Sequence, residues 1–426
     1  MKLEITPNQY FSLASVTTKK IGIVKCIISV DTHSQNTLTK QVIEQLYPDA
    51  LLSGSGTYSR EEFLDAVNLL GASIDIDVTD ARVSFILRTT SEALPKLLRL
   101  FAAMIQEPMF AHKELKRVKA VTLNQLQQAK EDSRAIAHEK LRNNFYGAAD
   151  RKYSYSIDEC IETVPRVTTT QLRKFHKQVV ENNWFCSIGG EAAAVKIFAT
   201  EMKKLKHDGN VSEGTHQPKP PKPNLSLENI PSRQNIDLSI GVPLPITRSH
   251  PDYIPLAFAI AVLGKVGGFA GRLMSTIREK EGLTYGIYSQ LEGFASQEQG
   301  YFRITTFFSP VNTVQGLKST FREIKKLHTH GVSHAEVDAF KTILATQQSF
   351  VKDSFTRTLA DLHNYHYEGF TVQEMHAYKR ALCDVKKADI NRVIKTYLDR
   401  VHMSVSGAGP VKDVQKDVRN WFESVS

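Results

Sequence analysis

The chain has 426 residues, of which 41% are hydrophobic and 23% are charged, and its formal net charge is +9. This composition is that of a globular protein of two or three domains, and it excludes a disordered tail and a fibre. No segment approaches the roughly 18 consecutive apolar residues that a membrane-spanning helix requires, so we expect no membrane contact.

The first twenty residues carry Glu4, Asn8 and Gln9 among scattered apolar residues and lack the compact apolar stretch of a secretory signal. The four cysteines lie far apart without a C-x-x-C pair, which argues against a zinc ribbon and a disulfide scaffold. They are Cys26, Cys160, Cys186 and Cys383. We therefore expect reduced thiols and a cytoplasmic protein.

The first half of the chain contains a pair of predicted strands followed by two predicted helices. Alternating apolar residues at 74–78 and 83–87 indicate the strands, and helical spacing at 94–105 indicates the first helix. A second, long helix is expected over about 111–146. The half ends with an apolar segment, 184–189, that predicts a strand running into glycine.

Residues 207–232 differ sharply in composition from both flanks, because they are rich in Pro, Lys and Gly and have almost no periodic apolar pattern. Proline fixes φ and removes a hydrogen-bond donor, so this segment is expected to be an extended linker. It divides the chain into an N-terminal domain, 1–206, and a C-terminal domain, 233–426.

The second half repeats the pattern of the first at an offset of about 220 residues. Helical spacing recurs at 314–324, and a long helix is expected over about 333–367. Predicted strands lie at 285–291 and 301–308, and a glycine-ended strand lies at 402–407. These patterns predict an α+β protein of two homologous domains, each an antiparallel sheet covered by helices, which face each other across a cavity.

The positive charge raises the question of nucleic-acid binding, but lysine and arginine are not clustered. In the densest run, 113–119, Glu114 interrupts the cations, and no RNA-binding aromatic signature accompanies it. We expect no nucleic-acid partner.

Two groups of histidines have spacing that a metal site could use. They are His363 with His366, and His328 and His330 with His334. Both signals are weak, and a structural role is the favoured interpretation.

The segment 267–286 carries a family resemblance. It reads GGFAGRLMSTIREKEGLTYG, which resembles the C-terminal domain of the pitrilysin and insulinase superfamily of zinc metallopeptidases. Gly56-Thr57, Leu70-Gly71-Ala72 and Pro108-Met-Phe110 stand in the order that this family shows. The resemblance spans nearly the whole chain. The chain is similar to the family's bacterial two-domain members, which are half-length.

The resemblance implies a zinc motif, H-x-x-E-H, in the first domain, with a further glutamate downstream. Counted from Gly56-Thr57, Tyr47 and Leu51 occupy the histidine positions and Ala50 that of the catalytic base. The downstream ligand falls near Gln125. None of these side chains supplies the family's metal chemistry, and Pro48 is expected to disturb the helix. We interpret the first domain as a degenerate metallopeptidase domain with no metal of its own.

The second domain keeps a pair that the family uses. Arg278 and Tyr285 match an arginine and a tyrosine that, by the resemblance, bind the substrate backbone and stabilise the oxyanion. The alternative is that Arg278 pairs with Glu281 while Tyr285 packs at a strand end. The nearby Gly267, Gly268 and Gly271 do not form a phosphate loop, and we assign them to close backbone approach or positive φ beside the substrate.

Bacterial relatives that work as heterodimers divide zinc and the Arg/Tyr pair between two subunits. The leading hypothesis is therefore a substrate-binding subunit that is inactive alone and pairs with a zinc-bearing homologue to cleave peptides or unfolded proteins. Two alternatives are an assembly homologue without a peptidase role and an independent hydrolase with a relocated metal site.

Overall fold

The computed structural model describes residues 1–7, 11–18, 22–32, 36–79, 82–205, 219–220, 222–266 and 269–425. The chain folds into two compact units that alternate along the sequence. The first unit comprises Met1–Leu126, Tyr155–Gly214 and Phe350–His376, and the second comprises Gln127–Ser154, Thr215–Ser349 and Ala377–Ser426. Each unit thus includes one segment from the other half of the chain. The division into 1–206 and 233–426 stays a prediction, and positions 207–218 and 221 of the proposed linker lie outside the described residues.

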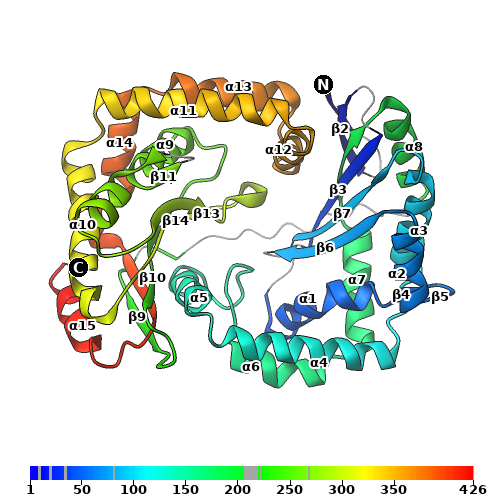
Figure 1. Ribbon diagram of the computed structural model, residues 1–426, viewed down its shortest axis with the longest axis horizontal. Coiled ribbons are helices and arrows are strands. Elements are labelled where there is room, and N and C mark those ends of the chain that lie inside the picture. The colour runs from blue at the N-terminus through cyan, green and yellow to red at the C-terminus, as the bar shows by residue number, and fades with distance from the viewer. Residues whose placement is uncertain are drawn as a thin grey trace. The chain divides into compact units, whose positions relative to one another are not determined.

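Six strands form the sheet of the first unit, in the order β1-β2-β8-β3-β7-β6 (Figure 1). Neighbouring strands are antiparallel, except that β2 and β8 are parallel. The strands are β1 (Lys2–Pro7), β2 (Phe11–Thr17), β3 (Ile23–Asp31), β6 (Ser73–Thr79), β7 (Arg82–Thr90) and β8 (Trp184–Gly190). The predicted strand pair 74–78 and 83–87 is the antiparallel pair β6 and β7.

Helices and one face of this sheet enclose the core of the first unit. The alternate residues Val24, Cys26, Ile28 and Val30 of β3 are fully buried, as the two-residue period of a strand requires. The helices of this half are α1 (Leu38–Leu51), α2 (Arg60–Leu69), α3 (Leu94–Gln106), α4 (His112–Ala129), α6 (Ile157–Thr163), α7 (Thr169–Glu181) and α8 (Ala192–Met202). A short hairpin of β4 (Gly54–Ser55) and β5 (Tyr58–Ser59) follows α1.

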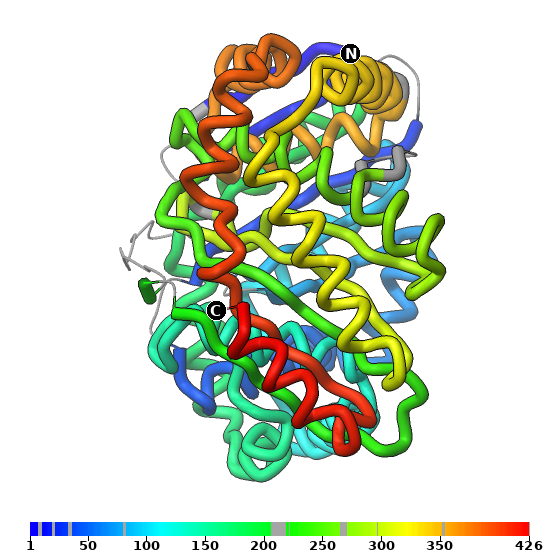
Figure 2. The backbone as a smooth tube through the Cα atoms, turned by 90° about the vertical axis from the view of Figure 1, so that its left-hand side faces the viewer, coloured from blue at the N-terminus to red at the C-terminus, as the bar shows by residue number. Residues whose placement is uncertain are grey.

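The second unit has a five-stranded sheet in the order β13-β14-β10-β15-β9, in which only β15 and β9 are parallel. The strands are β9 (Leu225–Asn229), β10 (Ile236–Pro243), β13 (Ile287–Glu292), β14 (Tyr301–Phe308) and β15 (Ser404–Gly409), with a separate hairpin of β11 (Lys265–Val266) and β12 (Phe269–Ala270). The helices are α9 (Tyr253–Leu263), α10 (Thr313–His330), α14 (Lys387–Tyr397) and α15 (Gln415–Glu423), together with the larger parts of α11 (His334–Asp353) and α13 (Val372–Asp384). The C-terminal helix α15, red in Figure 2, packs on α10 through Trp421 and Phe321, whose ring centroids are 4.9 Å apart.

Two helices belong to the unit that is formed mainly by the other half of the sequence. Helix α5 (Ser133–Phe145) belongs to the second unit, where Ser133 Oγ donates to Asp237 on β10 at 2.5 Å. Helix α12 (Phe355–Tyr367) belongs to the first unit, where the ring of Phe355 packs over Gly189 of β8. Figure 1 shows α5 beside β10 and α12 beside β2.

The expectation of single long helices over 111–146 and 333–367 is wrong. The first is divided into α4 and α5, and the second into α11 and α12. Side-chain caps begin the second helix of each pair, because Asp132 accepts from the Ala135 amide and Ser354 accepts from the Arg357 amide. Such caps satisfy amides that a helix start leaves without partners. The divisions allow α5 and α12 to join the opposite units.

The predicted α+β class and the internal repeat agree with the structure. Each unit carries a mainly antiparallel sheet with helices, and the two glycine-ended strands are β8 and β15. The paired helices α4 and α11 begin at His112 and His334, as the repeat predicts. In the described part of the chain, no helix is both long and apolar enough to cross a membrane.

Candidate functional site

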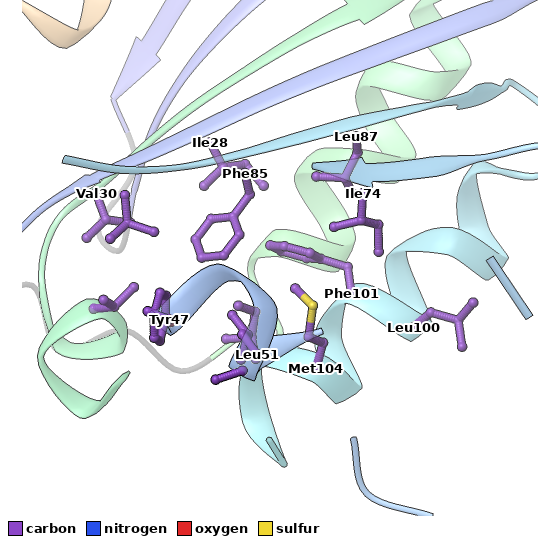
Figure 3. Packing of buried hydrophobic residues seen from close by; sticks show 14 of the residues in the cluster. Ile28, Val30, Tyr47, Leu51, Ile74, Phe85, Leu87, Leu100, Phe101 and Met104 are labelled. Atoms are coloured by element: carbon purple, nitrogen blue, oxygen red, sulfur yellow. The ribbon is translucent and has the colours of Figure 1, made fainter. Parts of the chain in front are cut away.

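The end of α1 carries the three residues that the resemblance assigns to the zinc motif. Tyr47, Ala50 and Leu51 are 0%, 3% and 0% exposed. Figure 3 shows Tyr47 and Leu51 among the apolar side chains of the first core, which include Phe85 and Met104. Leucine and alanine offer no donor atom to a cation. This turn therefore serves the core of the first unit.

Pro48 lies inside α1, and the expectation that it disturbs the helix is wrong. A proline removes the hydrogen bond that its amide would donate to the carbonyl four residues earlier, here that of Glu44, and its ring crowds that carbonyl. The helix nevertheless continues to Leu51, and the carbonyl of Pro48 accepts from the Leu52 amide at 3.2 Å.

Tyr47 is held by a histidine from α7. The Tyr47 hydroxyl lies 2.8 Å from Nδ1 of His176, and Nε2 of His176 lies 2.7 Å from the carbonyl oxygen of Ile105. A carbonyl only accepts, so Nε2 carries the proton and Nδ1 accepts from Tyr47. Burial lowers the pKa of His176 and raises that of Tyr47, which keeps both neutral. The position of the first zinc ligand is thus part of a satisfied hydrogen-bond chain.

Gln125 lies on the exposed side of α4. Its amide is a poor ligand for catalytic zinc, and the buried motif positions offer a phenol and two hydrocarbon side chains. Within the described ranges, no group of three or more His, Cys, Asp or Glu side chains is placed to hold a metal ion. The residues of this region therefore do not fit the family's zinc site.

The pair His363 and His366 lies in the packing of α12 on the first sheet. The two ring nitrogens of His363 each lie 2.8 Å from a serine hydroxyl, on Ser29 and Ser187, and Nε2 of His366 lies 2.5 Å from Ser12 Oγ. Burial lowers the pKa of His363 to about 3 and that of His366 to about 4. These neutral imidazoles hold a helix in place.

Arg278 and Tyr285 stand in the second unit on either side of a tight turn. Arg278 lies in a π-helix, Met274–Lys280, and Tyr285 lies in the bend that precedes β13. Arg278 is exposed and Tyr285 is 83% exposed. Neither side chain makes a hydrogen bond or ion pair with any residue that the structure describes. The two groups are therefore free to meet another molecule from this surface.

The alternative interpretation of this pair does not match the contacts. Glu281 pairs with Arg322 of α10, so it is not the partner of Arg278. Tyr285 does not pack at the strand end, because most of its surface is exposed.

The segment that carries the pair is fixed to the second core. Ile277, next to Arg278, is fully buried, and its carbonyl accepts from the Leu283 amide at 3.0 Å. The amide of Ile287, at the start of β13, lies 3.5 Å from the sulfur of Met274. These contacts connect the π-helix to the start of β13. Short π-helical segments are frequent at functional sites.

In the glycine-rich turn before the π-helix, the backbone at Gly271 lies close to the backbone at Gly264. A Cβ on Gly271 would lie 1.4 Å from the carbonyl oxygen of Gly264, so no other residue fits at position 271. Gly271 has no positive φ, and close approach alone explains it. Gly267 and Gly268 lie outside the described residues, and the proposed contact of all three glycines with substrate stays a prediction.

The far end of β13 is held by an ionic cluster. Glu292 accepts from Arg303 at 2.6 Å and from Tyr301 at 2.7 Å, and its carboxylate lies 2.9 Å from His138 of α5. Burial alone would raise the pKa of Glu292, but the hydrogen bond with His138 and the charge of Arg303 lower it to about 2. β13, which begins two residues after Tyr285, is thus held at its start by the contact between Ile287 and Met274 and at its end by the contacts of Glu292.

His176 was not predicted from the sequence. It is separated from Tyr47 by 129 positions, so no local pattern connects the two. The one available signal is that α7 places it among the buried residues Leu172, Phe175 and Val179. A polar side chain on such a face requires a buried partner.

Comparison with known proteins identifies the family. Residues 166–344 match the domain described as the peptidase M16 inactive domain, and residues 45–156 match the insulinase domain of peptidase family M16. The non-peptidase homolog YmxG of Helicobacter pylori is 22% identical over 368 residues, which cover 84% of this chain and 82% of that protein. An uncharacterized zinc protease of Streptomyces coelicolor is 20% identical over 380 residues, 86% of this chain and 80% of that one.

Solved structures show the same fold. The crystal structure of a peptidase M16 inactive domain from Pseudomonas fluorescens has a TM-score of 0.85 at 21% identity, covering 96% of this chain and 98% of that chain. A protease from Helicobacter pylori has a TM-score of 0.79 at 16% identity, with 96% and 99% covered. With models of both family domains matched, at 45–156 and 166–344, the chain belongs to peptidase family M16.

Proposed function

We propose that this chain is the substrate-binding subunit of a zinc peptidase complex, in which a homologous partner carries the metal. In this proposal Arg278 binds the backbone of the peptide and Tyr285 donates a hydrogen bond to the oxyanion of the tetrahedral intermediate. The substrate is a peptide or an unfolded protein segment. The complex works in the cytoplasm, in keeping with four free cysteines.

The contrast in exposure between the two motif regions carries the proposal. The side chains at the positions assigned to the zinc motif are buried, whereas Arg278 and Tyr285 are exposed and make no hydrogen bond or ion pair with any described residue. A guanidinium and a phenol can bind and polarise a peptide carbonyl, but they cannot generate a nucleophile from water. A partner that supplies zinc and a general base completes that chemistry.

Reconstitution tests the proposal. The purified chain is mixed with its zinc-bearing homologue, and cleavage of a fluorogenic unstructured peptide is measured for each protein alone and for the mixture. We expect cleavage by the mixture only, and a loss of about 10²-fold in kcat for Tyr285→Phe, the size typical of removing one oxyanion donor. Equal rates for the mixture and the partner alone would contradict the proposal.

An assembly role without chemistry is the competing function, and the same mixture distinguishes it. It predicts a stable complex whose activity is unchanged by Arg278→Ala and Tyr285→Phe. An independent hydrolase with a relocated metal is distinguished by metal analysis of the isolated chain, because it predicts stoichiometric zinc that survives dialysis.

A further inference from the structure

β14 has one polar residue among the side chains that point into the core of the second unit. The inward positions of this strand are Phe302, Ile304, Thr306 and Phe308, and the three apolar members are fully buried. Thr306 is 1% exposed. Valine has the same shape as threonine and would fill this place without a polar atom, so the hydroxyl at 306 needs a reason beyond packing.

The hydroxyl of Thr306 contacts the bend that carries Tyr285. It donates to the carbonyl oxygen of Gly286 at 3.1 Å and lies 3.5 Å from the hydroxyl of Thr284. Thr284, 7% exposed, accepts from the Gly286 amide at 3.2 Å and lies 3.2 Å from the Gly286 carbonyl oxygen. Both backbone groups of Gly286 are therefore held by two buried threonines, which we call the threonine clamp.

Tyr285 depends on this clamp for its position. Its side chain is 83% exposed and makes no hydrogen bond within the described part of the chain, so the backbone on either side determines where the phenol lies. That backbone consists of Thr284 and Gly286. A Cβ at 286 would lie 3.0 Å from the ring of Tyr288, so a larger residue there would require that ring to move.

We propose that Thr306 and Thr284 are positioning residues for Tyr285, which orient its hydroxyl toward the peptide carbonyl. This inference rests on the proposed function of Tyr285. The cost of a misplaced group is large, since a shift of 1 Å can lower a rate about 10²-fold. A partly released bend is expected to lower kcat about tenfold, with KM nearly unchanged because Arg278 still binds the substrate.

The test compares Thr306→Val with Thr306→Ser in the reconstituted complex. Valine keeps the shape and removes the hydroxyl, whereas serine keeps the hydroxyl and removes a methyl group. We expect kcat to fall about tenfold for valine and to stay within about twofold of the wild type for serine, at a temperature where denaturation shows both variants fully folded. A merely structural role predicts that activity instead follows the measured melting temperatures of the two variants. Thr305→Val, on the other face of the same strand, is the matched control.

Hydrogen exchange at the Gly286 amide gives a second measurement on the isolated chain. We expect faster exchange in Thr306→Val and Thr284→Val and unchanged exchange in Thr305→Val. Unchanged exchange in the first two, or full kcat in Thr306→Val, would overturn the inference. If Tyr285→Phe itself leaves the activity of the mixture unchanged, the proposed function fails, while the exchange rates still decide whether the threonines hold the bend.

Discussion

The two regions that the resemblance assigns to catalysis differ in their burial in this chain. At the end of α1 the side chains are buried, and Tyr47 is bonded to His176. In the π-helix and in the bend that precedes β13, Arg278 and Tyr285 are exposed and without partners among the described residues. The first region has been absorbed into the core, so changes there should affect stability. The second contributes little to the fold, so changes there should affect only activity.

Restoring the zinc motif is expected to have the largest effect on stability. The variant carries Tyr47→His, Ala50→Glu, Leu51→His and Gln125→Glu. A carboxylate at position 50 and two imidazoles would enter an apolar core, at a cost of several kcal/mol, roughly the desolvation of unpaired polar groups. Chemical denaturation and metal analysis measure the outcome. A variant that folds with wild-type stability and binds one zinc would show that the region still holds the family's site.

Acid should weaken the first unit through its buried histidines. The folded-state pKa is about 3 for His363 and about 4 for His366, below the unfolded value near 6.5. The unfolded chain therefore binds protons first as the pH falls, and stability is lost between about pH 6.5 and pH 3, by several kcal/mol in total. Denaturation at a series of pH values measures this. The loss should be smaller in His363→Gln, and equal pH profiles for the two proteins would contradict the assignment.

Tyr47→Phe isolates the hydrogen bond between Tyr47 and His176. The change leaves Nδ1 of His176 buried without a donor, which should lower the free energy of unfolding by about 1–3 kcal/mol. Tyr58→Phe is the control, since this tyrosine is 38% exposed, and it should change stability by less than about 0.5 kcal/mol. Equal effects of the two substitutions would mean that the bond with His176 adds nothing.

Arg278→Ala should have the smallest effect on stability, within about 0.5 kcal/mol, because the guanidinium has no partner among the described residues. Its matched comparison is Arg272→Ala, six positions earlier. Arg272 pairs with Glu336 at 2.6 Å and donates to the Gly331 carbonyl at 2.8 Å, so its removal should cost about 1–3 kcal/mol. If both substitutions destabilised equally, Arg278 would be a structural residue and the contrast between the regions would fail.

Much of the fold follows from local patterns. Two-residue alternation predicted β6, β7 and β14, and the internal repeat predicted that α4 and α11 begin at equivalent residues. The exchange of α5 and α12 was not predicted, because the capping residues Asp132 and Ser354 each interrupt an otherwise continuous helical pattern. Which sheet a helix joins depends on contacts between distant residues, which periodicity does not contain.

The candidate site was predictable only in its residue identities. The spacing of Arg278 and Tyr285 within a family motif selected them, but their exposure depends on the π-helix and the bend at 284–286. Likewise, the degenerate motif was visible in the sequence, whereas the bond between Tyr47 and His176 joins α1 to α7. Sequence patterns identify chemical groups, and packing decides whether they serve the core or the surface.

Peptide cleavage by the reconstituted pair tests the central claim most directly. The wild-type chain, the Arg278→Ala/Tyr285→Phe variant and the control Lys280→Ala are each mixed with the zinc-bearing homologue, after denaturation has shown equal stability. We predict that the wild type and Lys280→Ala restore cleavage, whereas the double variant forms the complex but loses at least about 10²-fold in kcat. Full activity of the double variant would contradict the account.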